Sequence, residues 1–424
     1  MMTRLVPLVV FVVCYGLFVV YPRKRSAIAM AGALAIIVTG SLSWRQAVLE
    51  CVQWNVIGLF FGTLLLAELF VQSRMAAVIA EKLVDSTRTM RGAMLAICAL
   101  SSVLSMFVEN VAVVLVVAPV ALSLAEKLKA SPVRLLILIA LCSNLQGTAT
   151  LVGDPPSMIL AGHLRMTFND FFVYRGRPGI FFVVQAGAIG AALIAAFLLR
   201  GHRESIKVVS VEKVRSFVPS TLLLVLIGGL SLSALFDRDF RWFAGAFAMI
   251  LGGVGLLWYR FHARWGRIRK LVGMLDWDTT FFLVGVFVLV GAVSKSGWLE
   301  SLAQGLTAVV GSNTVWAYIL IVGLAVVVSA FVDNVPFLLA MIPVTQTVAK
   351  NLGTEVPLLM FGLLVGACLG GNITPIGASA NIVAVGMLNK RGHAVSFREF
   401  MAVGCPFTLA AVVAASLLLW MIWS

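Results

Sequence analysis

Long apolar segments separated by short, mostly basic segments make up most of this chain. Crossing a bilayer takes about 20 apolar residues in a helix. Ten segments approach or exceed that length: 5–21, 26–42, 56–71, 133–160, 179–199, 217–236, 242–259, 279–293, 358–388 and 400–423. The alternating pattern of a membrane β-barrel is absent from the sequence. The pattern predicts an all-α polytopic membrane protein.

Two other apolar segments, at about 92–125 and 315–350, are each interrupted by an acidic residue followed by Asn. We expect each to form a re-entrant hairpin with its tip at the Asn. The segments at about 133–161 and 358–388 contain glycine-rich interruptions, which predict broken helices. Two semi-polar stretches, Gln72 to Arg91 and Ser294 to Gly311, predict helices that lie at the membrane interface.

The sequence repeats itself. The segment 107–111, FVENV, returns 224 residues later as FVDNV at 331–335. Two glycines follow each Asn at the same spacing: Gly147 and Gly153 in one copy, Gly371 and Gly377 in the other. Matches kept at a fixed offset indicate a tandem structural repeat.

We assign residues 1–200 to a first repeat, 201–216 to a cytoplasmic linker and 217–424 to a second repeat. Each repeat then holds five spans and one hairpin. An odd number of spans makes the two repeats insert in opposite directions, so the prediction is a pair of inverted repeats. That plan is typical of secondary transporters, whose site lies where the repeats meet.

Composition and charge support a membrane protein. Hydrophobic residues make up 61% of the chain and charged residues 12%, against about 25% in soluble domains. The net charge of +14 does not indicate nucleic-acid binding, because Lys and Arg concentrate in short loops. Placing most of them in the cytoplasm puts both termini outside. We expect no cleaved signal peptide, and a location in the plasma (inner) membrane of a prokaryote.

The hairpin tips and helix breaks hold the candidate site. Asn110 and Asn334 each offer an amide oxygen to a cation and an amide N–H to an anion. Glycines in the breaks let backbone carbonyls approach a ligand closely. The other candidates for substrate or ion binding are Gly147, Thr148, Thr150, Gly153, Gly371, Asn372, Thr374, Gly377, Ser379 and Asn381. The alternative is that these residues only cap broken helices.

Three acidic residues at membrane depth, Glu109, Asp333 and Asp154, are candidates for proton or cation coupling. A carboxyl group there is costly and therefore a functional candidate. The alternative is that helix N-termini merely satisfy them. The six cysteines have no metal-type spacing, so we expect buried thiols, no metal site and no cofactor beyond a coupling proton or sodium ion. Cys142 and Cys368 lie near the breaks and would suit a soft arsenic ligand.

The segments 147–156, GTATLVGDPP, and 366–381, GACLGGNITPIGASAN, resemble those of the ion transporter superfamily. The resemblance is to the branch of arsenite permeases, NhaD-type sodium/proton antiporters, plant silicon-efflux carriers and the melanosomal P protein. It implies a homodimer with a scaffold domain and an elevator-like transport domain. The more distant dicarboxylate symporters have Ser-Asn-Thr at the hairpin tips. Acidic tips instead disfavour a dianion and favour cation or proton coupling.

The predicted function is that of a secondary active exporter of an ion, oxyanion or metalloid such as arsenite or antimonite, driven by protons or sodium. A sodium-coupled dicarboxylate or sulfate symporter of the same fold is the alternative, and an ion channel is the alternative of another class. The spans carry no pattern of a nucleophile with a base, so we do not expect an enzyme. The chain has no nucleotide-binding loop, which leaves a separate ATPase subunit open.

Overall fold

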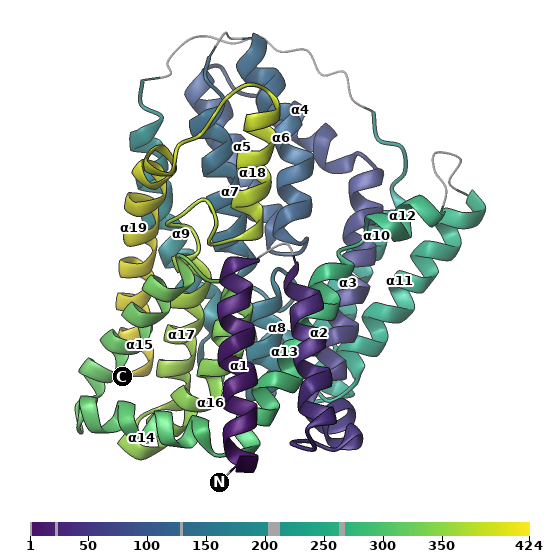
Figure 1. Ribbon diagram of the computed structural model, residues 1–424. Coiled ribbons are helices and arrows are strands. Elements are labelled where there is room, and N and C mark those ends of the chain that lie inside the picture. The colour runs from purple at the N-terminus through teal and green to yellow at the C-terminus, as the bar shows by residue number, and fades with distance from the viewer. Residues whose placement is uncertain (1, 22–23, 128–129, 202–212, 263–267) are drawn as a thin grey trace.

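The computed structural model describes residues 2–21, 24–127, 130–201, 213–262 and 268–424. Helices supply nearly all of its regular structure (Figure 1). Most of the linker expected at 201–216 lies outside the described residues. Both termini lie in the lower half of Figure 1.

The first half follows the predicted order. Its helices are α1 (Met2–Val20), α2 (Arg25–Val38), α3 (Trp54–Gln72), α4 (Met75–Asp85), α5 (Met90–Ser105), α6 (Asn110–Lys127), α7 (Val133–Gly147), α8 (Pro155–Leu164) and α9 (Ile180–Leu198). A π-helical turn, η2 (Gln46–Cys51), precedes α3. Before α9 lie a short 3-10 helix, η3 (Phe168–Phe171), and two paired strands, β1 (Val173–Tyr174) and β2 (Arg177–Pro178), which the sequence pattern did not predict.

The second half repeats this order. Its helices are α10 (Val218–Ser231), η4 (Ser233–Leu235), α11 (Phe243–His262), α12 (Ile268–Met274), α13 (Trp277–Lys295), α14 (Trp298–Val310), α15 (Thr314–Ser329), α16 (Asn334–Leu352), α17 (Val356–Gly370), α18 (Ser379–Lys390) and α19 (Phe397–Trp423). The short helix α12 was not predicted. The turns of the two hairpins, α5–α6 and α15–α16, fall at residues 106–109 and 330–333, directly before the two Asn residues.

Six of the ten predicted spans form one continuous helix that is long and apolar enough to cross a membrane. Within the described residues these are α3, α9, α10 with η4, α11, α13 and α19. The other four are apolar but shorter: Arg4–Val20 of α1, and the helices α2, α7 and α17. The short lengths of α7 and α17 follow from the predicted breaks, because each helix stops at its glycines and the chain resumes as α8 or α18.

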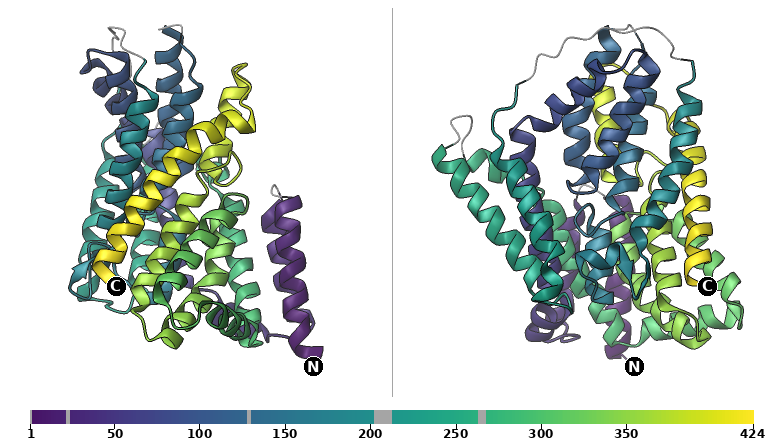
Figure 2. Two further views of the ribbon diagram at one scale, coloured as in Figure 1. Left: turned by 90° about the vertical axis from the view of Figure 1, so that its left-hand side faces the viewer. Right: turned by 180° about the vertical axis from the view of Figure 1, so that it is seen from behind.

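The two halves are packed into each other rather than side by side (Figures 1 and 2). Helix α3 packs along α11, and α13 packs along α2, so the third predicted span of each half packs against a helix of the other half. Glycine permits both contacts. A Cβ on Gly62 would lie 2.4 Å from the backbone of Ala248, and one on Gly285 would lie 2.6 Å from that of Ala29.

Helices from both halves also mix in the part that contains the hairpins. The first hairpin, α5–α6, packs with α7 and α18 in the upper part of Figure 1. The second hairpin, α15–α16, packs with α17 in the lower part, where α16 also contacts α8. The hairpin tips and both helix breaks therefore lie between these two groups.

Candidate functional site

Four helices that follow a hairpin turn or a helix break begin at one cavity between the hairpins. Its walls include the first residues of α6, α16, α8 and α18, which are Asn110, Asn334, Pro155 and Ser379. The empty space of the cavity, together with the open solvent at its mouth, is about 510 Å³. The start of a helix carries backbone N–H groups without helical partners and a partial positive charge. Four such ends facing one cavity make it attractive to oxygen atoms and to negative charge.

Local sequence explains why these helices start here. Glu109 accepts a hydrogen bond from the backbone N–H of Ala112 at 3.0 Å, and Asp333 accepts one from Val335 at 3.1 Å. Each acidic residue thus caps the helix that follows the hairpin turn. At the first break, Pro155 is the first residue of α8, a position where proline is tolerated because no helical N–H is lost.

Asn110 is fixed in place by its neighbours. Its amide oxygen accepts a hydrogen bond from the Ser105 hydroxyl at 2.5 Å, and its amide nitrogen donates to the side-chain oxygen of Asn144 at 3.2 Å. The Asn110 side chain is 5% exposed and contributes to the cavity wall. Asn334 is 7% exposed and lines the same cavity. The structure therefore brings the two hairpin-tip amides, from opposite hairpins, to one place.

The glycines of the breaks are needed for close backbone contact. A Cβ on Gly147 would lie 2.3 Å from the Asn110 amide oxygen, and one on Gly153 would lie 2.4 Å from the carbonyl oxygen of Gly147. In the second half, a Cβ on Gly377 would lie 2.6 Å from the carbonyl oxygen of Gly371. The two breaks thus share a glycine-on-glycine contact at matched positions.

Threonine hydroxyls attach each break to the turn of its own hairpin. Thr150 donates to the Met106 carbonyl and Thr374 donates to the Ala330 carbonyl, so both partners are related by the offset of 224. Both threonine side chains are fully buried. Their hydroxyls act in anchoring rather than in lining the cavity.

Asn144 joins the two breaks, and sequence reasoning missed it. Its amide nitrogen donates to the side-chain oxygen of Asn372 at 3.0 Å and to the Cys368 carbonyl at 3.2 Å. In return, Asn372 donates to the Leu141 carbonyl at 3.2 Å. An amide inside the apolar run of α7 was the available signal, because a buried polar side chain needs a partner. It was overlooked because Cys368 stands at the matching position of the second half.

The three acidic candidates line the same cavity, together with Asp276. Asp154 is 8% exposed, and its Oδ2 atom is buried without a hydrogen-bond partner among the described residues. Buried polar atoms normally have partners. Because Asp154 belongs to the cavity wall, this unpaired oxygen is a candidate acceptor for a proton, a cation or a substrate hydroxyl.

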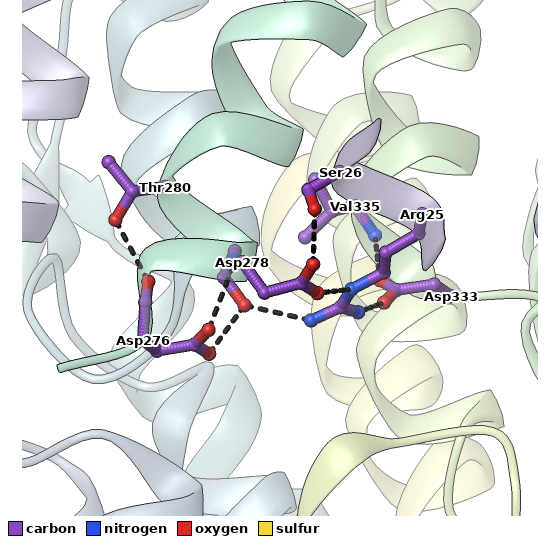
Figure 3. Close-up of polar contacts among 8 residues, drawn as sticks. Arg25, Ser26, Asp276, Asp278, Thr280, Asp333 and Val335 are labelled. Carbon is purple, nitrogen blue, oxygen red and sulfur yellow. Dashed lines mark hydrogen bonds and ion pairs between the residues drawn. The ribbon is translucent and has the colours of Figure 1, made fainter. Parts of the chain in front are cut away.

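A second residue that the sequence reasoning missed is Arg25, the first residue of α2 (Figure 3). Its guanidinium forms ion pairs with Asp278, at 2.9 Å, and with Asp333 at the tip of the second hairpin. It also donates to the Thr279 hydroxyl at 2.8 Å. In the sequence, Arg25 stands in the basic stretch between the first two predicted spans. Its charge instead faces the cavity, and among the described residues of the lining it is the one basic side chain.

The predicted residues therefore fall into two layers. Those in the cavity wall are Glu109, Asn110, Asp154, Asp333, Asn334 and Ser379. Those behind the wall, which shape the breaks, are Gly147, Thr148, Thr150, Gly153, Gly371, Asn372, Thr374, Gly377 and Asn381. Asn381, for example, donates to the carbonyls of Gly371 and Thr374 at 3.0 Å. Among the residues that the structure describes, no cluster of His, Cys, Asp and Glu could hold a metal ion.

Comparison with known proteins finds relatives among membrane transporters. A family model described as "Citrate transporter" matches residues 15–366 and 244–424. An uncharacterized transporter of Mycobacterium tuberculosis is 28% identical over 98% of each chain. The P protein of Sus scrofa is 26% identical over 94% of this chain, which spans 57% of that protein.

Two solved structures share the fold. The YdaH transporter of Alcanivorax borkumensis aligns with a TM-score of 0.61 at 17% identity, over 92% of this chain and 87% of its own. MtrF of Neisseria gonorrhoeae, described as one of a class of antimetabolite efflux pumps, aligns with a TM-score of 0.54 at 13% identity, over 92% and 83%. The polytopic helical fold, the match along nearly the whole chain and the relatives named as transporters lead to one conclusion: the chain is a membrane transporter that belongs to the citrate transporter family.

Proposed function

We propose that this transporter is a secondary active carrier that exports a small inorganic ion, oxyanion or neutral metalloid hydroxide of the arsenite type, coupled to protons or sodium. The observation that carries the proposal is a cavity lined by two hairpin-tip amides and four carboxyl groups. Amides donate and accept hydrogen bonds without requiring a charged partner, which suits a hydroxide. Carboxyl groups beside them supply the proton or cation site.

The balance of charge supports this choice over a free polyanion. The described cavity wall carries four carboxyl groups, Glu109, Asp154, Asp276 and Asp333, and one guanidinium. That guanidinium already pairs with two carboxylates. An anion of several charges would have to enter among acidic side chains unless protons or cations accompanied it.

A sodium-coupled carboxylate symporter is the second candidate. The description of the matching family model favours a carboxylate substrate. Four helix N-termini facing the cavity also favour an anion. On this alternative, cations bound at the acidic residues would offset the charge of the substrate.

We propose that transport occurs by an elevator-like displacement of the hairpins and broken helices against α1–α3 and α10–α13. The transporter would be a homodimer in which each protomer contains two inverted repeats. The matched anchors Thr150–Met106 and Thr374–Ala330 support a repeat of the same unit. Two closed hairpins over two broken helices favour a carrier over an ion channel. We propose the prokaryotic plasma membrane as its location and leave a separate ATPase subunit to experiment.

Flux measurements in liposomes test the proposal. The purified protein is reconstituted, a pH or sodium gradient is imposed, and the fluxes of arsenite, antimonite, silicic acid, dicarboxylates and citrate are measured. We expect a metalloid or oxyanion flux that reverses when the gradient is reversed and disappears in Asn110→Ala. Gradient-driven uptake of citrate or a dicarboxylate alone would establish the second candidate. Flux without coupling to either gradient would contradict both.

A further inference from the structure

The contacts of Arg25 divide into two kinds. On one side it joins α2 to α13 through Asp278 and the Thr279 hydroxyl, and the Ser26 hydroxyl donates to the same Asp278 carboxylate (Figure 3). The guanidinium also lies 5.0 Å from the centre of the Phe282 ring. On the other side it reaches Asp333, which belongs to the tip of the second hairpin. The first set of bonds stays within one tightly packed helix pair, whereas the second crosses to the hairpin.

The first half joins the corresponding pair of helices without a charged side chain at this position. In the first half, Asn55 occupies the place of Asp278 at an offset of 223, since Trp54-Asn55 corresponds to Trp277-Asp278. Asn55 accepts a hydrogen bond from the Gly245 N–H at 2.7 Å and donates to the Phe240 carbonyl at 2.8 Å. This neutral amide thus fastens α3 to the start of α11. The same position in the second half carries an acid that holds Arg25 toward the cavity.

The two hairpin tips also differ, because only one of the two acidic residues is paired with a cation among the described residues. Asp333 pairs with Arg25, whereas its counterpart Glu109 forms no ion pair with any other described residue. A second bond joins the same tip to α1, because the Tyr15 hydroxyl donates to the Pro336 carbonyl. Of the two hairpin tips, only that of the second is therefore held, in this conformation, by a cation among the described residues.

We propose that Arg25 is an internal substitute for the coupled cation: it occupies Asp333 in this conformation, and a proton or sodium ion replaces it when the hairpin tip moves away from α2. The inference rests on the proposed function, because it requires a coupled cation. Several charged or titratable groups face Asp333 or line the same cavity: Tyr15 from α1, Arg25 from α2, Asp276 and Asp278 at the start of α13, Glu109 from the first hairpin and Asp154 before α8. Of these, only Arg25 is a cation.

On this proposal, Arg25 and the coupled cation compete for the carboxylate of Asp333. A guanidinium bound to a carboxylate stabilises the ionised form and repels a second cation. An ion pair of purely structural value would instead leave cation affinity unchanged when it is removed.

Sodium and proton binding to the purified transporter test this. Binding of radioactive sodium is measured against concentration at several pH values for the wild type, Arg25→Gln, Asp333→Asn and the double variant, with thermal unfolding as a check on folding. We expect Arg25→Gln to lower the half-saturating sodium or proton concentration by about 10-fold or more. Asp333→Asn removes the carboxylate for which Arg25 and the cation compete. The double variant should therefore bind the cation no more tightly than Asp333→Asn alone. Arg25→Lys retains the charge and should stay close to wild type.

A matched control is Arg91→Gln, another partly buried arginine, which donates to the Ala196 carbonyl far along the chain and does not line the cavity. It should leave cation binding unchanged. If Arg25→Gln binds cations with wild-type affinity while gradient-driven flux persists, the role of Arg25 is overturned and the proposed function stands. If neither sodium nor protons bind or drive flux in the wild type, both are overturned. An Arg25→Gln variant too unstable to measure is replaced by Asp278→Asn, which loosens Arg25 and should shift affinity in the same direction.

Discussion

Replacing Gly147 by Ala tests whether the first break must touch the hairpin tip. The backbone of Gly147 is helical, so alanine adds no conformational strain and only the added Cβ matters. That atom would lie 2.3 Å from the Asn110 amide oxygen, whereas contacts under 3.0 Å are essentially never seen. The amide would therefore have to move by about 0.7 Å or more. Ser105 and Asn144 hold it on the other sides at 2.5 and 3.2 Å.

We expect overpacking to cost about 1–3 kcal/mol. At about 2 °C per kcal/mol, the apparent Tm falls by about 2–6 °C. Transport should fall more than stability, because the displaced amide lines the cavity. Thermal unfolding in detergent and flux in liposomes measure the two effects separately.

The control is Gly323→Ala in α15, where an added Cβ meets nothing within 4 Å. It should be neutral or slightly stabilising, since alanine is the better helix former by about 1 kcal/mol. Placing Gly147→Ala in the Asn110→Ala background should cost less than in the wild type, because the atom that clashes is gone. A Gly147→Ala protein with wild-type Tm and flux would refute the reasoning.

Three further predictions follow from the site and its surroundings. Asn110→Ala and Asn334→Ala should each abolish flux while the protein still inserts and elutes as a folded species, and normal flux in either variant would return that residue to a capping role. If a cavity carboxyl carries the coupled proton, at least one of the neutral variants Glu109→Gln, Asp333→Asn and Asp154→Asn should lose the pH dependence of transport while substrate exchange survives. Unchanged pH profiles in all three variants would exclude all three residues as the proton carrier. Outside the spans, burial alone would raise the pKa of Asp237, but backbone N–H donors from the start of α11 outweigh burial and lower that pKa. The ionised Asp237 therefore stabilises the folded protein at pH values above the ordinary pKa of Asp, and this stabilisation is lost as the pH falls through the lowered pKa. Asp237→Asn should reduce the free energy of unfolding by about 1–2 kcal/mol at pH 7, and the difference from wild type should disappear in acid. A difference in stability that is the same at pH 7 and pH 3 would contradict this.

Much of the fold was predictable because the same turn and helix-breaking residues occur at matched positions in both halves. The Asn at each hairpin tip and the glycines at each break gave the position of the turns to within a few residues. Helix α12 and the strands β1 and β2 were missed because they are short and carry no periodic pattern.

The candidate site was predictable only as far as the repeat extends. Asn110 and Asn334 were found as a matched pair, whereas Asn144 and Arg25 have no counterpart of the same type in the other half. Arg25 also lies in a basic stretch, where a charge that faces solvent and one that faces a cavity look alike in sequence. Only the packing of α2 against α13 distinguishes them.

The exchange of helices between the halves has a consequence for how the protein is made. The face of α3 that contains Gly62 is completed by Ala248 of α11, which is synthesised about 190 residues later. At about 5–20 residues per second, that interval is roughly 10–40 s. Throughout it, α3 sits in the lipid or beside the insertion machinery with its glycine face unpartnered, and α2 waits still longer for α13. Biogenesis therefore ends with a late, concerted assembly, and a ribosome that stalls between the halves leaves a membrane-inserted fragment that quality-control proteases can recognise by its open helix faces.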